Sequence, residues 1–463
     1  MPRRGLGADL LTVGAAALLV TAAAVVGGHL LQRGVPLHVD APPLGAQPLP
    51  HTGPGTVPAV VVALLVVLRG PELARRLPWR PLLALATLAT LGWTMTLALI
   101  DGWQRGVAGR LTTDTEYLHD VGRVGDIGAM LRGFAERIPG LRPDSWTVHV
   151  AGHPPGALLV FVGLDRIGLS GGVPAALLCV LVGSTAGTAV AVTVRALGAE
   201  SAARAALPFA VLFPGAIWVG VSADGLFAGV LAWGVALLAI GATCPALDLP
   251  ALAAALGGGL LLGATLFLSY GLVLAGLLPV AVALTARRLT PLLVASAGVA
   301  TVVAAFAAAG FWWWDGYRQV VVRYYQPGEY GLQRPYGYWV WADLACLVVV
   351  LGPAGVAGLR RALLSAGRVL PSAGLAVVTD PHTRSWRCLK SIQPAPLCVA
   401  ALIAVIVADL SGLSKAEVER IWLPFAVWLM AATGLLPQRQ ARWWLAAQAL
   451  LALAVNHLLL TTW

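Results

Sequence analysis

Two acidic residues, Asp114 and Glu116, are the first side chains in this sequence whose type and position suggest chemistry. They stand in Leu-Thr-Thr-Asp-Thr-Glu-Tyr, directly before Tyr117 and shortly after a long apolar run. A carboxylate that is partly desolvated near a lipid bilayer has a raised pKa and is a stronger general base. The alternative is structural, with Asp114 capping a helix that begins near Glu116.

Two histidines follow in Thr-Val-His-Val-Ala-Gly-His-Pro-Pro-Gly, at positions 149 and 153. The two prolines fix the chain after His153, so that this side chain is held rigidly where it could contact a phosphate. The alternative is a loop histidine that only caps the next helix. Because Gly and Pro interrupt the segment, His149 and His153 do not share a helical face, and we expect no metal site on them.

A third group combines a turn and a late arginine. Ser222 and Asp224 lie in a tight turn between two apolar runs, where Asp224 either bonds to its own turn or points into a shared cavity. Arg420 precedes another apolar run, and its planar fork suits bidentate binding of phosphate. Arg420 could instead extend to the membrane surface or pair with Glu417 and Glu419.

Aromatic residues are concentrated between positions 311 and 335, including Trp312–Trp314, Tyr324, Tyr325 and Tyr330. Such residues are typical of the interfacial belt of membrane proteins. The same side chains would also stack on a sugar or cover a lipid chain.

The amino-acid composition is that of a membrane protein, so these residues must be positioned by apolar segments. Of the 463 residues, 58% are hydrophobic and only 11% are charged, whereas soluble proteins have roughly 25% charged residues. A cytosolic enzyme, a disordered chain and an ordinary nucleic-acid binder are thereby excluded. The arginine-rich composition, with lysine only at positions 390 and 415, is typical of a GC-rich genome such as an actinobacterial one.

Apolar runs predict an all-α integral membrane protein with 12 or 13 transmembrane helices. The predicted spans are 9–31, 56–69, 81–101, 173–193, 205–221, 225–241, 249–268, 270–286, 291–310, 336–355, 394–410, 421–436 and 442–460. Between the third and fourth spans, residues 102–172 form a large outer loop. Within it, 116–138 and 155–168 are predicted as two helices that lie in the membrane interface.

The distribution of charge predicts the orientation. With the N-terminus in the cytoplasm, most basic residues fall on the inner side and most acidic residues on the outer side, as the positive-inside rule requires. We interpret the first apolar run as a retained span; a cleaved signal peptide is the alternative. The predicted units are an N-terminal hairpin (1–80), a catalytic core (81–440) and a last transmembrane helix (441–463).

Four motifs, in this order, resemble the GT-C superfamily of polytopic glycosyltransferases. They are Asp114, Glu116 and Tyr117; His153–Gly156, similar to the His-Pro-Pro or Lys-Pro-Pro of protein O-mannosyltransferases and aminoarabinose transferases; Phe213 and Pro214 ahead of Ser222 and Asp224; and Glu419–Pro424. The resemblance covers about residues 81–440. It departs from the family in the two spans that precede residue 81 and in His153, where some relatives have Lys.

The resemblance implies transfer of a single sugar, mannose or arabinose, from a polyprenyl phosphate at the outer face of the plasma membrane. Asp114 is the first choice for the general base and Glu116 the second, and Asp101 stays open as an alternative. His153 and Arg420 would hold the donor phosphate. The substrate cavity would be lined by Tyr117, His149, Ser222, Asp224, Tyr324 and Tyr325. The acceptor would be a glycan, a lipid or a protein, and no metal, organic cofactor or nucleic acid is expected.

Two other function classes remain open at this point. A flippase or other transporter of lipid-linked sugars would need charges inside its spans, of which Asp409 is the nearest case. A scaffold of GT-C-like fold that has lost its chemistry is the third possibility. An ATP-driven pump is not expected, because the sequence has no phosphate-binding loop motif.

Overall fold

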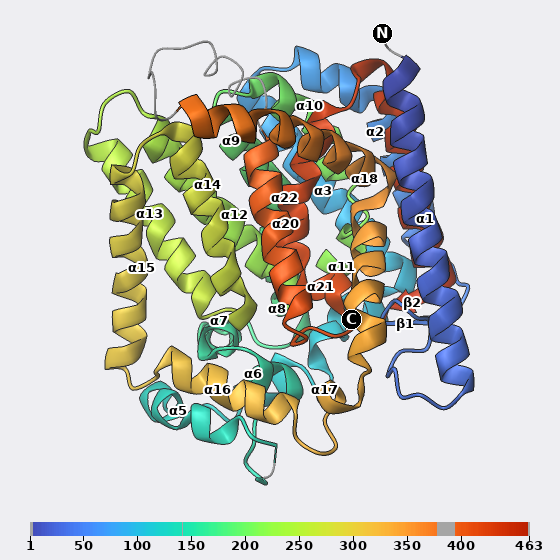
Figure 1. Ribbon diagram of the computed structural model, residues 1–463. Helices are drawn as coiled ribbons and strands as arrows, with labels where there is room; N and C mark the ends of the chain where they lie inside the picture. Colours follow the sequence, from blue (N-terminus) through green and yellow to red (C-terminus); the bar gives the residue numbers. More distant parts are fainter. Residues whose placement is uncertain (1–2, 141, 377–393, 462–463) are drawn as a thin grey trace.

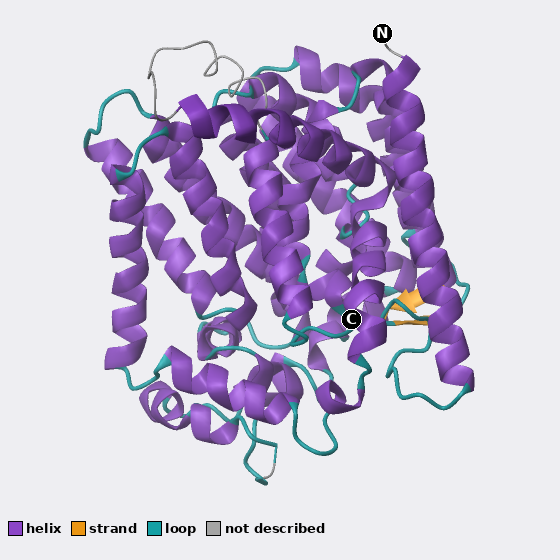
Figure 2. Cartoon of the chain, viewed as in Figure 1, coloured by secondary structure: helices purple, strands orange, loops and turns teal. Residues whose placement is uncertain are grey.

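The protein is a bundle of helices with a single two-stranded sheet in the part that the computed structural model describes, residues 3–140, 142–376 and 394–461 (Figures 1 and 2). Eight helices in these residues are long and apolar enough to cross a membrane, and three further apolar helices are shorter. The prediction of an all-α, multi-pass membrane protein is confirmed at this level. The count of 12 or 13 spans stays a prediction.

The N-terminal and middle parts of the bundle contain eleven of the helices. They are α1 (Arg3–Gln32), α2 (Thr56–Arg76), α3 (Trp79–Ala98), α8 (Gly172–Ser184), α9 (Ala186–Ala196), α10 (Glu200–Val211), α11 (Ala216–Val219), α12 (Ala223–Thr243), α13 (Leu249–Leu266), α14 (Leu277–Ala286) and α15 (Thr290–Ala308). The C-terminal part adds α18 (Tyr336–Ala376), α20 (Ala395–Leu410), α22 (Leu423–Leu429) and α23 (Ala441–Leu458).

Short helices gather at the end of the bundle opposite the start of α1, which we call the site end (Figure 1). They are α4 (Tyr117–Val121), α5 (Ile127–Gly133), α6 (Val148–Gly152), α7 (Pro155–Arg166), α16 (Trp313–Tyr324), α17 (Tyr330–Gln333) and α21 (Val418–Ile421). Segments of 3-10 helix span Leu99–Asp101, Arg110–Thr112, Ala135–Arg137, Tyr270–Gly276, Met430–Leu435 and Gln438–Gln440, and a π-helical turn spans Gln104–Ala108. Strands β1 (Ala46–Pro48) and β2 (Leu459–Thr461) pair antiparallel.

Small residues allow the central helices to approach closely. A Cβ atom at Gly259 of α13 would lie 2.0 Å from the carbonyl oxygen of Ala295 in α15, so that only glycine fits there. Close contact of this kind is typical of helix packing in membranes, where dispersion contacts replace the hydrophobic effect.

The predicted interfacial helix at 116–138 is wrong as a single element. The chain forms α4, then α5, then a 3-10 turn, because Gly122 follows α4 and Asp126 starts a new helix by accepting a hydrogen bond from the Ala129 amide. The predicted helix at 155–168 is confirmed as α7, with Pro155 in its first turn.

The predicted span 205–221 is also not one continuous helix. Helix α10 ends at Val211, and α11 begins only at Ala216. The break has a sequence cause, since Pro214 has no amide hydrogen and disfavours helical geometry at Phe213.

Helix α18 is interrupted at Gly352, whose φ of 66° is left-handed. Gln448 of α23 satisfies the backbone groups that this break exposes: its Nε2 donates to the Leu351 carbonyl at 3.0 Å, and its Oε1 accepts from the Ala354 amide at 3.0 Å. A side chain at Gly352 would collide with Gln448. The last helix thereby fixes the bend of α18.

Helix α1 packs along α18 and is fixed there by a buried carboxylate. Asp9 is fully buried and accepts hydrogen bonds from Arg360 at 2.9 Å and from Arg361 at 2.6 Å and 3.0 Å. Hydrogen bonds to charged groups are the strong ones in such surroundings.

We expect Asp9→Asn to lower the free energy of unfolding by about 2 kcal/mol, because it removes the charge that the two arginines share. Thermal unfolding in detergent, followed by tryptophan fluorescence, measures this. Asp40→Asn is the control, since Asp40 is an exposed acid in the loop after α1. Equal midpoints for both variants would contradict the prediction.

Candidate functional site

Arg420 of α21 lies at the centre of a buried polar network at the site end. Its Nη1 donates to Asp224 Oδ2 at 3.1 Å, and its Nη2 donates to His149 Nε2 at 3.3 Å and to Glu417 Oε2 at 3.4 Å. Arg420 and Asp224 are each only 3% exposed. Attraction by these acids outweighs the effect of burial and raises the pKa of Arg420, which therefore stays charged.

Asp224 is held in place by the start of α12. Ser222 is the N-cap of this helix: its Oγ accepts from the Gly225 amide at 3.3 Å and donates to the Trp218 carbonyl at 2.7 Å. Ser222 is thus engaged in backbone bonds. Asp224 stands in the first turn, where the helix dipole favours a negative charge.

His149 connects Arg420 to the acidic segment before α4. Because Arg420 donates to Nε2, the hydrogen of the neutral ring is on Nδ1, which lies 3.0 Å from Glu116 Oε1. Burial raises the pKa of Glu116, but the attraction and hydrogen bond of His149 outweigh it, and the net pKa is below the ordinary value. Glu116 is therefore an ionised carboxylate that is already paired.

Glu417 extends the network to the aromatic-rich loop. Its other oxygen accepts from Arg334 at 2.7 Å, and Arg334 also donates to the Lys415 carbonyl at 2.8 Å. The sequence offered Glu417 and Glu419 as acids that could pair with Arg420. Glu417 does bond to Arg420, whereas Glu419 Oε1 accepts a hydrogen bond from the Gly45 amide at 2.6 Å. Sequence reasoning missed Arg334 as a site residue, because nothing local distinguishes it from other loop arginines.

Tyr117 forms the apolar side of the site. Its ring stacks on His149 at 6.1 Å and on Phe161 at 5.3 Å, and meets His153 edge-on at 5.6 Å between centroids. Burial raises the pKa of Tyr117 well above its ordinary value, so the phenol is neutral. The ring fixes the spacing between the two histidines.

His153 lies beside the network as a neutral base. Its Nδ1 donates to the His149 carbonyl at 2.7 Å, which leaves a lone pair on Nε2. Burial lowers the pKa of His153 to about 3. In this state Nε2 accepts a hydrogen bond, for example from a hydroxyl, but cannot donate one to a phosphate.

Asp114 and Glu116 diverge in the turn that precedes α4. Asp114 is exposed, whereas Glu116 is 7% exposed and faces His149. The capping alternative for Asp114 is wrong, because Glu116 is the N-cap residue of α4 and no side chain caps this helix. Asp114 thus remains an accessible carboxylate next to the network but not within it.

Asp101, the third candidate for the base, belongs to a different cluster. It lies 2.8 Å from His51 Nε2, and Arg110 Nη2 approaches it at 4.0 Å. Arg110 also donates to the Thr461 carbonyl at 2.9 Å and so links this cluster to β2. These contacts connect the N-terminal loop, the end of α3 and the C-terminal strand.

Tyr324 and Tyr325 both lie against Lys415, whose carbonyl accepts a hydrogen bond from Arg334 of the network. The Tyr324 hydroxyl accepts from the Lys415 amide at 3.3 Å, and Lys415 Nζ lies 5.5 Å and 5.7 Å from the two ring centroids. Tyr325 is 44% exposed. Of the two, Tyr325 is the one that a ligand could contact.

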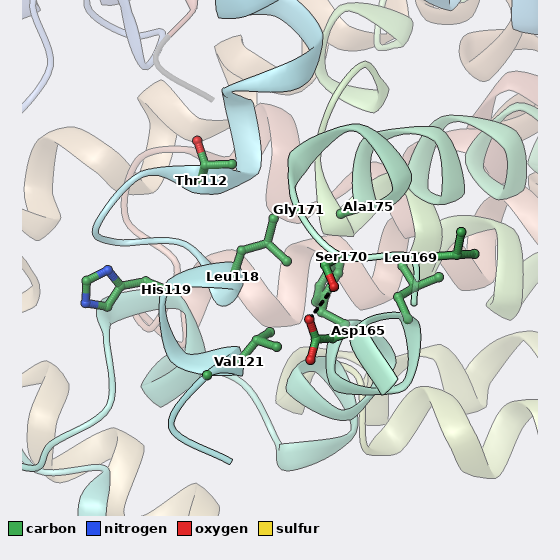
Figure 3. A pocket seen from close by; sticks show the side chains of 12 residues that line it. Thr112, Leu118, His119, Val121, Asp165, Leu169, Ser170, Gly171 and Ala175 are labelled. Atoms are coloured by element: carbon green, nitrogen blue, oxygen red, sulfur yellow. Dashed lines mark hydrogen bonds between the residues drawn. The ribbon is translucent and has the colours of Figure 1, made fainter. Parts of the chain in front are cut away.

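A pocket of about 300 Å³ adjoins the site between α4, α7 and the start of α8 (Figure 3). Phe161, which stacks on Tyr117, forms one wall, and Leu118 forms another. Figure 3 shows Ser170 bonded to Asp165 on one side of the pocket and His119 pointing away from the other labelled side chains. This pocket is not lined by the charged residues of the network, which are Glu116, Asp224, Arg334, Glu417 and Arg420.

No protein-family model matches the chain, and no curated protein matches its sequence. The resemblance to GT-C glycosyltransferases therefore depends on the four motifs. The contacts above bring together Glu116, Tyr117, His149, Asp224 and Arg420, with His153 and Ser222 beside them.

The neutral state of His153 predicts a pH effect on stability. Unfolded histidine titrates near about 6.5, whereas the folded residue has a pKa of about 3. As the pH falls from about 6.5 towards 3, only the unfolded chain gains this proton, so the wild type loses stability, by at most about 2 kcal/mol at about pH 5. We expect His153→Asn, which keeps a donor for the His149 carbonyl, to lose less.

Chemical unfolding at about pH 7 and about pH 5 measures the difference between these proteins. His119→Asn is the control, because His119 is exposed on the neighbouring helix α4. The same loss of stability in wild type and His153→Asn would contradict the assignment.

Proposed function

We propose that the protein is a membrane glycosyltransferase that moves a single sugar from a polyprenyl phosphate to an acceptor hydroxyl. The observation that carries this proposal is the network itself. Glu116, Asp224 and Arg420, from three of the four motifs, are joined through His149 in one buried site at one end of an apolar bundle, and His153 of the fourth motif lies beside them. A site at the membrane boundary suits a substrate that has a lipid tail and a polar head.

Asp114 is the residue that we assign as the general base. A base must touch the acceptor hydroxyl, and Asp114 is exposed while Glu116 is occupied by His149. In the reaction, the Asp114 carboxylate takes the hydroxyl proton, and the hydroxyl oxygen forms a bond to the anomeric carbon. The bond from that carbon to the phosphate oxygen breaks, and the phosphate leaves with the electron pair. Because the hydroxyl attacks on the face opposite the phosphate, the configuration of the anomeric carbon is inverted.

Arg420 provides positive charge for the leaving phosphate. Its terminal nitrogens donate to three acceptors, and we propose that the phosphate takes the place of one of them. Glu417 is the partner at the longest distance, 3.4 Å, and it keeps its bond to Arg334 at 2.7 Å when it is displaced. His153 Nε2 would accept a hydrogen bond from a sugar or acceptor hydroxyl.

Several features of the substrates and location belong to the proposal. The donor sugar is mannose or arabinose, and the acceptor is a glycan, a lipid or a protein. The site faces the outside of the plasma membrane, since the arginine-rich end, with Arg75, Arg76, Arg195 and Arg204 near helix ends, lies opposite to it. The neighbouring pocket of about 300 Å³ is at the lower limit for small-molecule sites.

The test is sugar transfer by the purified protein with radiolabelled polyprenyl-phosphate sugars and membrane extract as acceptor. We expect Asp114→Asn to reduce the rate by at least about a hundredfold without changing the melting temperature, because only the base is lost. Asp315→Asn is the matched control, since Asp315 is an exposed acid on α16 at the same end. Full activity of Asp114→Asn would contradict the assignment.

Glu116→Gln separates positioning from catalysis in the same assay. If Glu116 orients His149 and Arg420, this variant loses stability and activity together. If Glu116→Gln abolishes transfer at an unchanged melting temperature while Asp114→Asn is active, then Glu116 is the base.

A transporter of lipid-linked sugars is the second candidate, because two carboxylates lie within apolar helices. Asp343 of α18 is 1% exposed and accepts a hydrogen bond from the Ala416 amide at 3.2 Å. Asp409 of α20 is 6% exposed, and its Oδ1 has no hydrogen-bond partner among the described residues. Buried acids in spans mark proton or ion pathways in transporters. The two candidates differ in whether the bond between sugar and phosphate is broken.

A further inference from the structure

A cavity at the end opposite the site lies between α2, α10 and the segment that joins α22 to α23. It has a volume of about 530 Å³. Its walls include Pro71, Ala74 and Arg75 of α2 and Arg204 and Ala205 of α10. Figure 1 places α2 and α10 towards the end where α1 begins.

The polar side of this cavity has an excess of positive charge. Arg204 is used within the protein: it bonds to Glu200 at 2.8 Å and to the Ala74 and Leu77 carbonyls. Arg75 also lines the cavity and is exposed, and no carboxylate of the described chain lies within ion-pair distance of it.

The acids near Arg75 are occupied by other partners. Glu72 pairs with Arg76 at 2.8 Å, and Glu200 pairs with both Arg195 and Arg204. The guanidinium of Arg75 therefore has its charge available to a ligand, and its planar fork suits a phosphate.

The apolar side continues from the cavity along α2. Pro71, Leu68 and Leu64 precede Arg75 by four, seven and eleven positions and therefore lie on the same face of the helix. Leu68 is 52% exposed and Leu64 is 54% exposed, in a helix long and apolar enough to cross a membrane. The positive charge of Arg75 thus lies at the end of an exposed apolar stripe formed by Leu68 and Leu64.

We infer that this cavity binds the headgroup of an anionic phospholipid, with the phosphate on Arg75 and one acyl chain along Leu68 and Leu64. A basic pocket between helix ends on the arginine-rich side of a membrane protein is suited to this ligand. The stripe distinguishes a lipid from a free phosphate, which would gain nothing from Leu68 and Leu64. The site is independent of the proposed catalysis.

The test is native mass spectrometry of the full-length protein, with dioleoyl phosphatidylglycerol and dioleoyl phosphatidylcholine as probes. We expect wild type to retain the anionic lipid preferentially. Arg75→Gln should bind it about fivefold more weakly, the effect of one arginine near a membrane surface. Arg76→Gln is the matched control, because Arg76 is the adjacent residue, faces another side of α2 and is paired with Glu72.

A second variant tests the cavity instead of the charge. Ala205→Phe places a ring in the cavity, and we expect it to weaken binding of phosphatidylglycerol at an unchanged lipid-free melting temperature. Equal binding by wild type, Arg75→Gln and Ala205→Phe would overturn the inference. Complete competition by millimolar inorganic phosphate would also overturn it, in favour of a soluble anion.

Discussion

A guanidinium buried among apolar helices is unfavourable unless charged acceptors surround it, and the site end is built around this constraint at Arg420. Asp224 and His149 come from two distant parts of the chain to meet it, and Glu417 stands shortly before it in the sequence. Glu116 then orients His149, and Arg334 offsets the second oxygen of Glu417. A rearrangement of the loops at this end that broke these contacts would leave a buried charge without its partner.

The sequence predicted the apolar helices well and the connections between them less well. The apolar runs 225–241 and 291–310 correspond closely to α12 (Ala223–Thr243) and α15 (Thr290–Ala308). The length of an apolar run can be read from the local sequence alone. The breaks at Gly122 and Pro214 were missed, although both residues stand in the sequence. The bend at Gly352 could not be predicted, because Gln448, 94 to 97 positions later, is what satisfies it.

The residue types of the site were also predictable, but their roles were not. Glu116 and Asp114 are two positions apart and equivalent by composition; only the contact with His149 separates a paired acid from an exposed one. His153 was expected to hold a phosphate, yet its bond to the His149 carbonyl makes it an acceptor at neutral pH. Hydrogen-bond partners fix such roles, and partners 196 and 271 positions apart leave no local signal.

The fate of the bond between sugar and phosphate is the most direct test of the central claim. The purified protein would be placed in sealed vesicles whose membrane contains a polyprenyl phosphate carrying a radiolabelled sugar, with acceptor on the side of Asp114. Our account predicts that the label leaves the polyprenyl phosphate and appears on the acceptor. Label that crosses the bilayer still attached to polyprenyl phosphate would contradict it and identify a transporter.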